Sequence, residues 1–331
     1  MWDKIVCSLV IPLLIKRLFL LILGGNSGIG FEIAKALSRQ GASVTIACRN
    51  PQRCFSAADK IRREYSGAQI SPLIMDVSDL FSVQRASQTW LHNNEGALDM
   101  LFLNAGIFYD GKDGDTTLPL SKDGIEKTFA TNVVGHHLLY RLLEPALLKS
   151  KMARVVSTSS VAGIVWLPPY SLPYRFGDTS SIIPATLDVL NSGTPSSILT
   201  FALYGRSKLA QAAWSKALTK RLGNKSSIYV NAAHPGAVYT PLASGKYFPS
   251  WWPAFFSKLI AYLEKRLLWT SEEGALTVMY LGVAIDEIRE KNIRGRYYHP
   301  QSVDYDHPHT GDEILQDNVW NLCEELVKAF L

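Results

Sequence analysis

The chain has 331 residues, of which 47% are hydrophobic and 19% are charged, as in a globular protein with a sizeable core. Its net charge of +5 is spread along the chain without the Lys/Arg runs of a nucleic-acid-binding protein, so we expect no nucleic acid partner. The four cysteines show neither a metal-site spacing nor a disulfide framework, which favours a reducing compartment and a cytoplasmic location.

Residues 1–17 are an apolar extension that precedes the first predicted strand. The mostly apolar stretch 5–15 contains Pro12 and is too short to span a bilayer. Asp3 weakens the basic start of a signal peptide, and no small-residue cleavage site follows. Two interpretations stay open: the segment lies on a membrane surface as a peripheral anchor, or it covers the protein's own apolar surface.

A continuous apolar run over 18–23 predicts a strand buried on both faces of a parallel sheet. A glycine-rich turn follows at once, and a helical pattern begins at Phe31. In this context glycines let backbone N–H groups approach a pyrophosphate, and the helix N-terminus adds a positive dipole end. We therefore expect a dinucleotide to bind at Gly24, Asn26, Ser27, Gly28, Ile29 and Gly30.

A second strand is predicted over 42–48 and ends before Arg49. An acid here would bind the ribose 2′-hydroxyl of NAD, whereas a cation suits the 2′-phosphate of NADP, so Arg49 favours NADP(H) over NAD(H). The structural alternative is a solvated surface arginine. A third strand, over 73–75, leads to Asp76 and Val77, where the carboxylate is placed to bind the adenine amino group. Asp76 could instead be a helix N-cap, a role open equally to its neighbours Ser78 and Asp79.

Small residues close a fourth predicted strand, over 98–103, and let backbone lie close to a ligand; they are Asn104, Ala105 and Gly106. Alternation of strands and helices over this length predicts an α/β fold, a doubly wound, mostly parallel, Rossmann-like sheet with helices on both faces. A fifth strand, over 154–160, delivers hydroxyl groups at its carboxyl end, where ligands bind in such sheets. Four candidates crowd there, namely Ser157, Thr158, Ser159 and Ser160.

Tyr204 and Lys208 lie four residues apart in a pattern typical of a helix, which places both side chains on one face. A lysine ammonium beside a phenol favours the phenolate, so we expect a lowered pKa for Tyr204 and proton transfer near neutral pH. Tyr170 and Tyr174 are rival candidates, but neither has a lysine four residues later.

A sixth strand, over 228–233, is followed by residues that can approach a nicotinamide: Pro235, Gly236, Val238 and Thr240. His234 precedes them, and a structural role is favoured for it over a catalytic one. His307 and His309 could clip a metal, but no further ligand cluster accompanies them, so a surface loop and no metal site are expected. A last strand is predicted over 295–299 and a closing helix over 318–330.

These ordered motifs resemble the short-chain dehydrogenase/reductase family. That family opens with Thr-Gly-x-x-x-Gly-Ile-Gly, and residues 23–30 here read Leu-Gly-Gly-Asn-Ser-Gly-Ile-Gly, with a leucine in place of the threonine. The similarity runs from about residue 18 to 242 and is strongest to retinol dehydrogenase and WW-domain oxidoreductase-like members, including fungal ones. The resemblance implies one domain over 18–331 and a catalytic tetrad of Asn132, Ser160, Tyr204 and Lys208.

The resemblance also implies an insertion at 164–200, between the catalytic serine and tyrosine, and a substrate lid at 241–270. Aromatic residues are frequent in the lid, which suits an apolar small-molecule substrate, a membrane surface, or packing against the domain or a second subunit. The expected activity is NADP(H)-dependent interconversion of an alcohol and a ketone or aldehyde. The alternative is a catalytically silent nucleotide-binding protein that serves as a redox sensor or scaffold.

Overall fold

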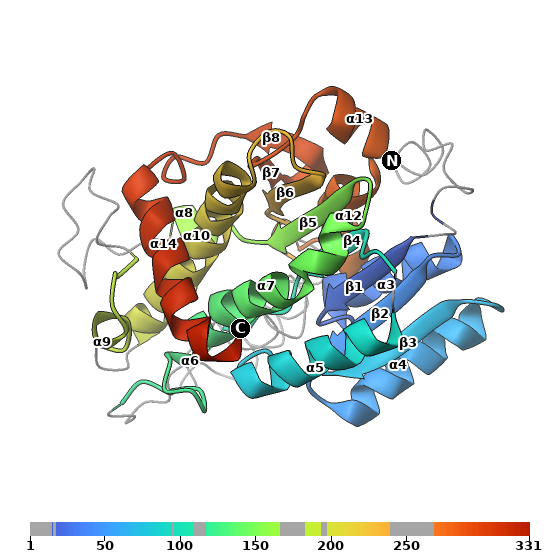
Figure 1. Ribbon diagram of the computed structural model, residues 1–331, viewed down its shortest axis with the longest axis horizontal. Helices are drawn as coiled ribbons and strands as arrows, with labels where there is room; N and C mark the ends of the chain where they lie inside the picture. Colours follow the sequence, from blue (N-terminus) through green and yellow to red (C-terminus); the bar gives the residue numbers. More distant parts are fainter. Residues whose placement is uncertain are drawn as a thin grey trace, which may run out of the picture.

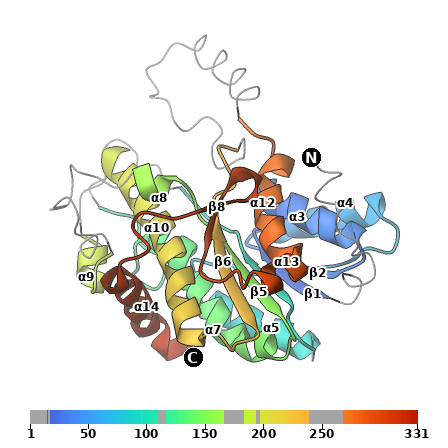
Figure 2. The ribbon, with the colours of Figure 1, turned by 90° about the horizontal axis from the view of Figure 1, so that it is seen from above.

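The computed structural model describes residues 15, 18–94, 96–108, 117–165, 183–192, 197–238 and 268–331. These ranges form an eight-stranded sheet in the order β3-β2-β1-β4-β5-β6-β7-β8, with helices on both faces (Figures 1 and 2). Strands β1 to β7 are parallel to their neighbours, and β8 pairs antiparallel with β7. The fold is therefore the doubly wound, Rossmann-like α/β sheet that the sequence predicts.

The eight strands of this sheet are β1 (Phe19–Leu23), β2 (Ser43–Cys48), β3 (Gln69–Ile74), β4 (Met100–Leu103), β5 (Ala153–Thr158), β6 (Ile228–Ala233), β7 (Tyr297–His299) and β8 (Val303–Tyr305). Three predictions need correction. Strand β3 begins at Gln69 rather than at residue 73, because only Ile70 and Leu73 of this edge strand are buried, and an edge strand tolerates Pro72. Strand β5 ends at Thr158, so Ser160 lies outside it. Strand β8 was not predicted, because all three of its residues are exposed.

The helices are α3 (Gly28–Arg39), α4 (Pro51–Glu64), α5 (Leu80–Asn93), α6 (Lys127–Phe129), α7 (Gly135–Leu148), α8 (Ala162–Val165), α9 (Leu187–Leu190), α10 (Ser197–Leu222), α12 (Ser271–Val283), α13 (Ile285–Glu290) and α14 (Glu313–Val327). A π-helical segment, η1 (Ala130–Val134), precedes α7, and 3-10 turns occur at Pro300–Ser302 and Lys328–Phe330. The predicted closing helix begins five residues early, at Glu313, where the Asp312 carboxylate accepts hydrogen bonds from the first turn.

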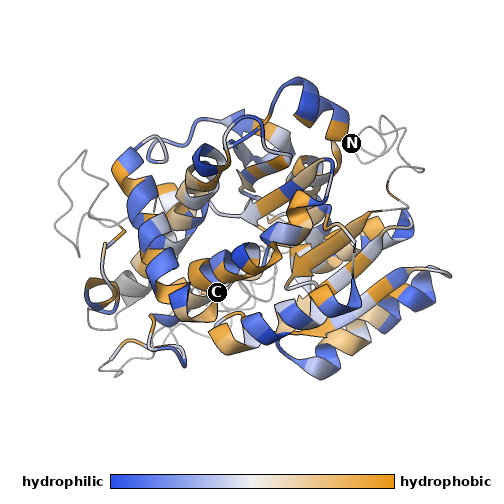
Figure 3. Ribbon diagram, in the orientation of Figure 1, coloured by the Kyte–Doolittle hydropathy of each residue, from blue (hydrophilic) through white to orange (hydrophobic). Residues whose placement is uncertain are grey.

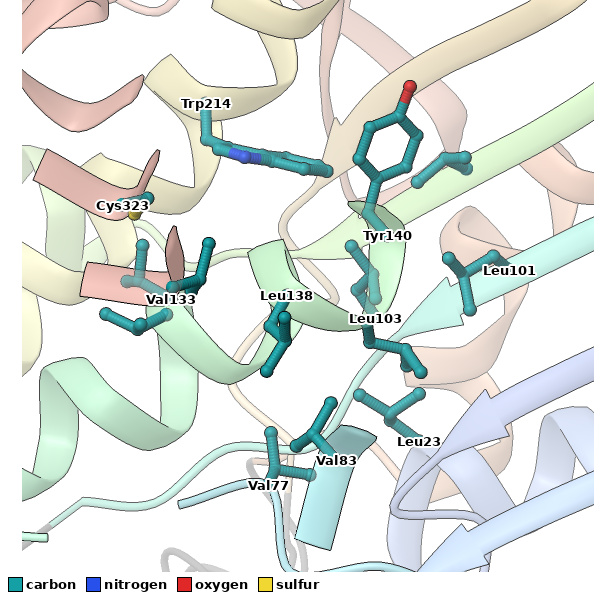
Figure 4. Close-up of a cluster of buried hydrophobic side chains, with 14 of the residues drawn as sticks. Leu23, Val77, Val83, Leu101, Leu103, Val133, Leu138, Tyr140, Trp214 and Cys323 are labelled. Carbon is teal, nitrogen blue, oxygen red and sulfur yellow. The ribbon is translucent and has the colours of Figure 1, made fainter. Parts of the chain in front are cut away.

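Two hydrophobic cores sandwich the sheet. Helices α5, α7, α10 and α14 cover one face, and α3, α4, α12 and α13 cover the other. Strand β1 serves both, since Leu21 and Leu23 enter the first core while Leu20 and Ile22 enter the second. Figure 4 shows the first core, in which Trp214 and Tyr140 meet edge to face with ring centroids 5.5 Å apart. The hydropathy colouring of Figure 3 matches this layering, with hydrophobic central strands and two-coloured outer helices.

Helix α10 carries the predicted catalytic pair and is buried on several sides, because it packs against β5 and β6, against α8, and against α14. In Figures 1 and 2 it lies between the sheet and α14. Within the described ranges, no helix is both long enough and apolar enough to cross a membrane. The same ranges hold no cluster of three or more His, Cys, Asp or Glu residues suited to a metal ion.

Several predicted segments lie outside the described residues. They are the N-terminal extension apart from Ile15, most of the 164–200 insertion, and most of the 241–270 lid. The rival tyrosines Tyr170 and Tyr174 and the predicted cofactor contact Thr240 are also outside. The described part of the insertion contains the short helix α9.

Candidate active site

The glycine turn after β1 leaves no room for side chains at its glycine positions. Gly24 and Gly28 have φ angles of +70° and +56°, which L side chains rarely adopt, and Gly24 N–H donates to the Ala47 carbonyl at 2.8 Å. A Cβ added at Gly30 would lie 2.5 Å from the Gly24 carbonyl oxygen. The turn is therefore as tight as a pyrophosphate-binding turn requires, and a dinucleotide fits the residues present.

The start of α3 offers open backbone donors to that cradle. Ser27 is the N-cap residue and is exposed, yet its side chain makes no capping hydrogen bond. Asn26 and Ile29 are half-buried beside it. The Ser27 side chain therefore does not occupy the first N–H groups of the helix, which suits the anion site that the sequence predicts. The prediction missed Gly25, where a Cβ would lie 2.5 Å from Ile46 Cγ2, although the Gly-Gly pair itself was the signal.

Asn104 braces the turn from the end of β4. Its Nδ2 donates to the Leu23 carbonyl at 3.1 Å, and its Oδ1 accepts from the Thr158 hydroxyl at 3.4 Å. Ala105 packs directly under the turn, since a Cβ at Gly24 would lie 3.2 Å from its Cα. The carboxyl ends of β1, β4 and β5 are therefore tied together at one edge, where doubly wound sheets bind ligands.

Arg49 is exposed just beyond the end of β2. The neighbouring Asn50 is the N-cap of α4, with its Oδ1 accepting from the Arg53 N–H at 2.9 Å. Among the described residues, Arg49 forms no ion pair, so its guanidinium is not committed to a carboxylate there. This exposure suits either the predicted 2′-phosphate contact or the solvated alternative.

Asp76 follows β3 and organises the loop before α5. Its Oδ1 accepts from the Ser78 N–H at 3.0 Å and from the Ser78 hydroxyl at 2.7 Å. The N-cap role belongs to Asp79, whose carboxylate accepts from Ser82 N–H at 3.0 Å. Val77 is buried, and its carbonyl oxygen would be 2.0 Å from a Cβ at Gly135, so η1 and α7 press against this loop.

Asn132 lies within the π-helical segment η1 and is fully buried. Its Oδ1 accepts from Ile107 N–H at 2.8 Å, and its Nδ2 donates to the Ile107 carbonyl at 3.1 Å and to the Ser207 hydroxyl at 2.9 Å. π-Helical turns are rare and often occur at functional sites. The side-chain amide links the loop after β4 to α10, the helix that carries the tyrosine and lysine.

The two serines after β5 have different environments. Ser159 is buried and donates to the Lys208 carbonyl at 2.6 Å, so it fastens this loop to α10. Ser160 is half-buried, and its Oγ accepts from Ala162 N–H at 3.2 Å. Gly163 lies against the same turn of α10, because a Cβ there would be 2.7 Å from the Leu209 nitrogen. Ser160 is thus held between two contacts with the turn of α10 that carries Lys208, through Ser159 on one side and Gly163 on the other.

Lys208 is buried at 4% exposure, and its Nζ lies 5.4 Å from the centre of the half-buried Tyr204 ring. Nζ donates to the Thr158 carbonyl at 2.9 Å and to Gln211 Oε1 at 2.8 Å. A Cβ at Gly106 would be 3.5 Å from Nζ, so only a glycine hydrogen separates this loop from the ammonium group. Burial lowers the pKa of Lys208 to about 7.

Phe108 was not singled out by the sequence, yet its ring packs edge to face against Tyr204 with centroids 5.3 Å apart. It follows the Asn-Ala-Gly segment by two residues and would have been found only by knowing that this loop faces α10. Edge-to-face packing restricts the tyrosine ring and keeps one side of it apolar.

The loop after β6 reaches the glycine turn through α12. Pro235 is buried, and Gly236 has a φ angle of +94°. A Cβ at Gly274 of α12 would lie 2.5 Å from Val238 Cγ2 and 3.4 Å from Ile29 Cγ1, so Val238 and the start of α3 share one neighbour. The predicted contacts after β6 that lie in the described ranges are therefore at the same end of the sheet as the glycine turn.

His234 accepts a hydrogen bond at Nδ1 from Gly236 N–H at 3.4 Å, which suits the structural role predicted for it. Burial, then the charges of His299 and Lys208, lower its pKa to about 4. The loop predicted around His307 and His309 is present, with Asp306 and Pro308 exposed, but the His307 side chain itself is 3% exposed and packs against Tyr297 with ring centroids 4.9 Å apart.

Comparisons with known proteins show the family to which the chain belongs. The family model described as short chain dehydrogenase matches residues 19–172. The human WW domain-containing oxidoreductase is 31% identical over 94% of this chain and 68% of its own length, and human retinol dehydrogenase 14 is 31% identical over 93% and 85%. The structure of L-sorbose reductase from Gluconobacter frateurii, solved with NADPH and L-sorbose, superposes with a TM-score of 0.63 at 18% identity, covering 86% of this chain and 95% of that one. This chain therefore belongs to the short-chain dehydrogenase/reductase family of oxidoreductases.

Proposed function

We propose that this protein is an NADP(H)-dependent oxidoreductase that interconverts an alcohol and a ketone or aldehyde on an apolar small molecule. The observation that carries the proposal is the buried Lys208 ammonium, 5.4 Å from the Tyr204 ring centre and next to the Gly106 backbone. A lysine here is placed to favour the Tyr204 phenolate, which is what a tyrosine needs to exchange protons near neutral pH.

Each member of the tetrad then has a separate task. During reduction Tyr204 donates a proton to the carbonyl oxygen, and Ser160 donates a hydrogen bond to the same oxygen and stabilises its developing charge. Lys208 lowers the pKa of Tyr204 and holds the nicotinamide ribose. Asn132 anchors a water that links Lys208 to solvent, and since both of its amide protons are already donated, that water bonds to an Asn132 oxygen. When bound, the dinucleotide supplies the hydride.

Dinucleotide binding is assigned to residues around the same edge of the sheet. The glycine turn and the start of α3 hold the pyrophosphate, Arg49 the 2′-phosphate, and Asp76 and Val77 the adenine. The nicotinamide half is assigned to the Asn104–Gly106 segment and to Pro235, Gly236, Val238 and Thr240. The bound NADPH in L-sorbose reductase supports this cofactor choice, as does the uncommitted charge of Arg49.

We assign catalysis to one unit over 18–331, with residues 241–270 as a lid over the substrate and 164–200 as an insertion beside it. The apolar character of the substrate rests on the aromatic residues of the lid sequence. The name of the relative retinol dehydrogenase 14 supports it, because retinol is an apolar alcohol.

The proposal is tested by measuring NADPH consumption by the purified protein with a panel of apolar ketones and aldehydes. We expect turnover of at least one compound and a loss of roughly 10²–10⁴-fold in Tyr204→Phe, because the acid is removed. Tyr65→Phe is the matched control, since this tyrosine ends α4 and its hydroxyl bonds Glu64. NADPH binding without turnover of any compound would favour the silent nucleotide-binding alternative. Equal activity in Tyr204→Phe would remove Tyr204 from its assigned role.

Cofactor choice is tested by thermal unfolding with NADPH and with NADH. We expect the larger stabilisation with NADPH, and Arg49→Gln should weaken NADPH binding about tenfold, equivalent to about 1.4 kcal/mol of stabilisation at saturation, with little change for NADH. Arg63→Gln, an exposed arginine in the last turn of α4, is the control and should change neither. A larger stabilisation with NADH would contradict the assignment of Arg49.

A further inference from the structure

Lys208 depends on a side chain that the sequence did not single out. Gln211 lies one turn further along α10, is 2% exposed, and accepts a hydrogen bond from Lys208 Nζ at 2.8 Å. An ammonium group only donates, so Gln211 must turn its carbonyl oxygen toward the lysine and its amide nitrogen the other way. The other acceptor, at Thr158, is a backbone carbonyl, which every residue type provides. Gln211 is therefore the acceptor of Lys208 that a substitution can remove.

His136 occupies the other side of the Gln211 amide. It comes from α7, and its Nδ1 lies 3.4 Å from Gln211 Nε2. Burial, and then the Lys208 charge, lower the pKa of His136 to about 3, so the imidazole is neutral and keeps one unprotonated nitrogen. With Nδ1 as that acceptor, His136 holds the amide in the one orientation that offers an oxygen to Lys208.

The remaining groups around Lys208 do not replace this acceptor. His234, at the end of β6, is neutral because burial lowers its pKa to about 4, and Tyr204 presents its ring from the preceding turn of α10. None of the ion pairs in the described ranges includes Lys208. Two neutral oxygens, from Thr158 and Gln211, thus stabilise the buried charge against the loss of hydration.

We propose that Gln211, oriented by His136, is a positioning residue for Lys208: its side-chain oxygen favours the charged form of the ammonium group and fixes it between the Gly106 backbone and the Tyr204 ring. This inference deepens the proposed function, because it rests on Lys208 serving Tyr204 and the dinucleotide at that point. A hydrogen bond to the charged form favours that form, so the acceptor opposes the effect of burial on the Lys208 pKa.

The test measures the Lys208 pKa in the protein without cofactor, by NMR titration of lysines labelled with ¹³C at Cε. The resonance that disappears in Lys208→Met identifies the residue. Gln211→Met removes the acceptor at similar size and should lower the pKa, whereas Gln211→Glu places a carboxylate there and should raise it by roughly one unit or more. A packing defect alone would not shift the pKa in opposite directions. An unchanged Lys208 pKa in both variants would overturn the proposal.

Matched controls come from Gln316, another buried glutamine, which lies in α14. Its Nε2 donates a hydrogen bond to the Thr310 carbonyl. Gln316→Met and Gln316→Glu should leave the Lys208 pKa unchanged. His136→Phe frees the Gln211 amide to rotate and should lower the Lys208 pKa, as Gln211→Met does; no shift there would contradict the orienting role of His136.

Turnover supplies an independent readout. The alkaline limb of kcat/KM with NADPH should move to lower pH in Gln211→Met and to higher pH in Gln211→Glu, since activity requires a charged Lys208. Because the NMR titration needs no cofactor, the two proposals fail separately. Absent turnover with shifted pKa values contradicts only the proposed function. Normal turnover with unshifted pKa values contradicts only the role of Gln211.

Discussion

Ser159 and Ser160 are neighbours of identical chemistry whose environments differ because β5 ends at Thr158. Beyond that point the backbone no longer alternates sides regularly, so one hydroxyl turns into the protein and bonds the Lys208 carbonyl, while the other stays half-buried. The residues alone left four hydroxyl candidates at the end of this strand and gave no reason to prefer one of them. The resemblance to the family selected Ser160, and the engaged hydroxyl of Ser159 agrees with that choice.

This difference predicts opposite outcomes for two alanine variants. Ser160→Ala should lower kcat by roughly 10²–10³-fold with little change in stability, because it removes a donor to the substrate oxygen. Ser159→Ala should leave most turnover intact and lower the free energy of unfolding by about 1 kcal/mol, because it removes one buried hydrogen bond. Steady-state kinetics and urea unfolding measure both. If Ser159→Ala lost turnover and Ser160→Ala lost only stability, Ser159 rather than Ser160 would be the donor to the substrate oxygen.

At the scale of elements, the junction of η1 and α7 is the most tightly packed feature near the site. Gly135 begins α7 directly after the π-helical turn that contains Asn132, and it abuts the Val77 carbonyl. The junction therefore couples the proposed adenine end of the cofactor site to the tetrad. Only a residue without a Cβ allows this approach, which explains the glycine at position 135.

Gly135→Ala tests this coupling. Its Cβ would lie 2.0 Å from the Val77 oxygen, so the backbone must separate, and we expect a loss of about 1–3 kcal/mol in unfolding free energy together with weaker NADPH binding. Gly311→Ala is the control, because nothing lies within 4 Å of its added Cβ. Calorimetry and cofactor titration give the two readouts. An unchanged unfolding free energy in Gly135→Ala would show that the backbone at Gly135 and Val77 can move apart without destabilising the protein.

At the scale of the whole molecule, buried neutral histidines make stability depend on pH. Burial lowers the pKa of His136 to about 3, of His234 to about 4 and of His307 to about 3. The unfolded chain binds a proton at each histidine below about pH 6.5, and the folded protein does not until the lower value is reached. Stability is therefore fully present above pH 6.5 and is lost as the pH falls toward 3–4.

The expected slope is about 1.4 kcal/mol per pH unit for each such histidine between pH 6.5 and 4. His307→Phe removes one titrating group away from the tetrad and should reduce the slope by that amount, whatever its effect on stability at pH 7. Urea unfolding at several pH values measures the slopes. The same slope in His307→Phe as in the wild type would show that the folded state already protonates this residue.

The sequence by itself determined the fold class, a doubly wound and mostly parallel sheet. It also determined the glycine turn and the positions of most strands. These depend on signals that act within a few residues: apolar runs for buried strands, glycines for tight backbone, and a four-residue spacing for one helix face. The predictions that failed were those where local signals were weak, as in the exposed strand β8 and the edge strand β3.

Only the tertiary structure decided which polar side chains meet. Asn132, Thr158, Lys208 and Gln211 come from three separate elements, and His136 from a fourth, so no spacing along the chain connects them. The same holds for the burial of His307 and for the contrast between Ser159 and Ser160. Burial and hydrogen-bond partners depend on contacts between distant segments, and these form only when both cores close on the sheet.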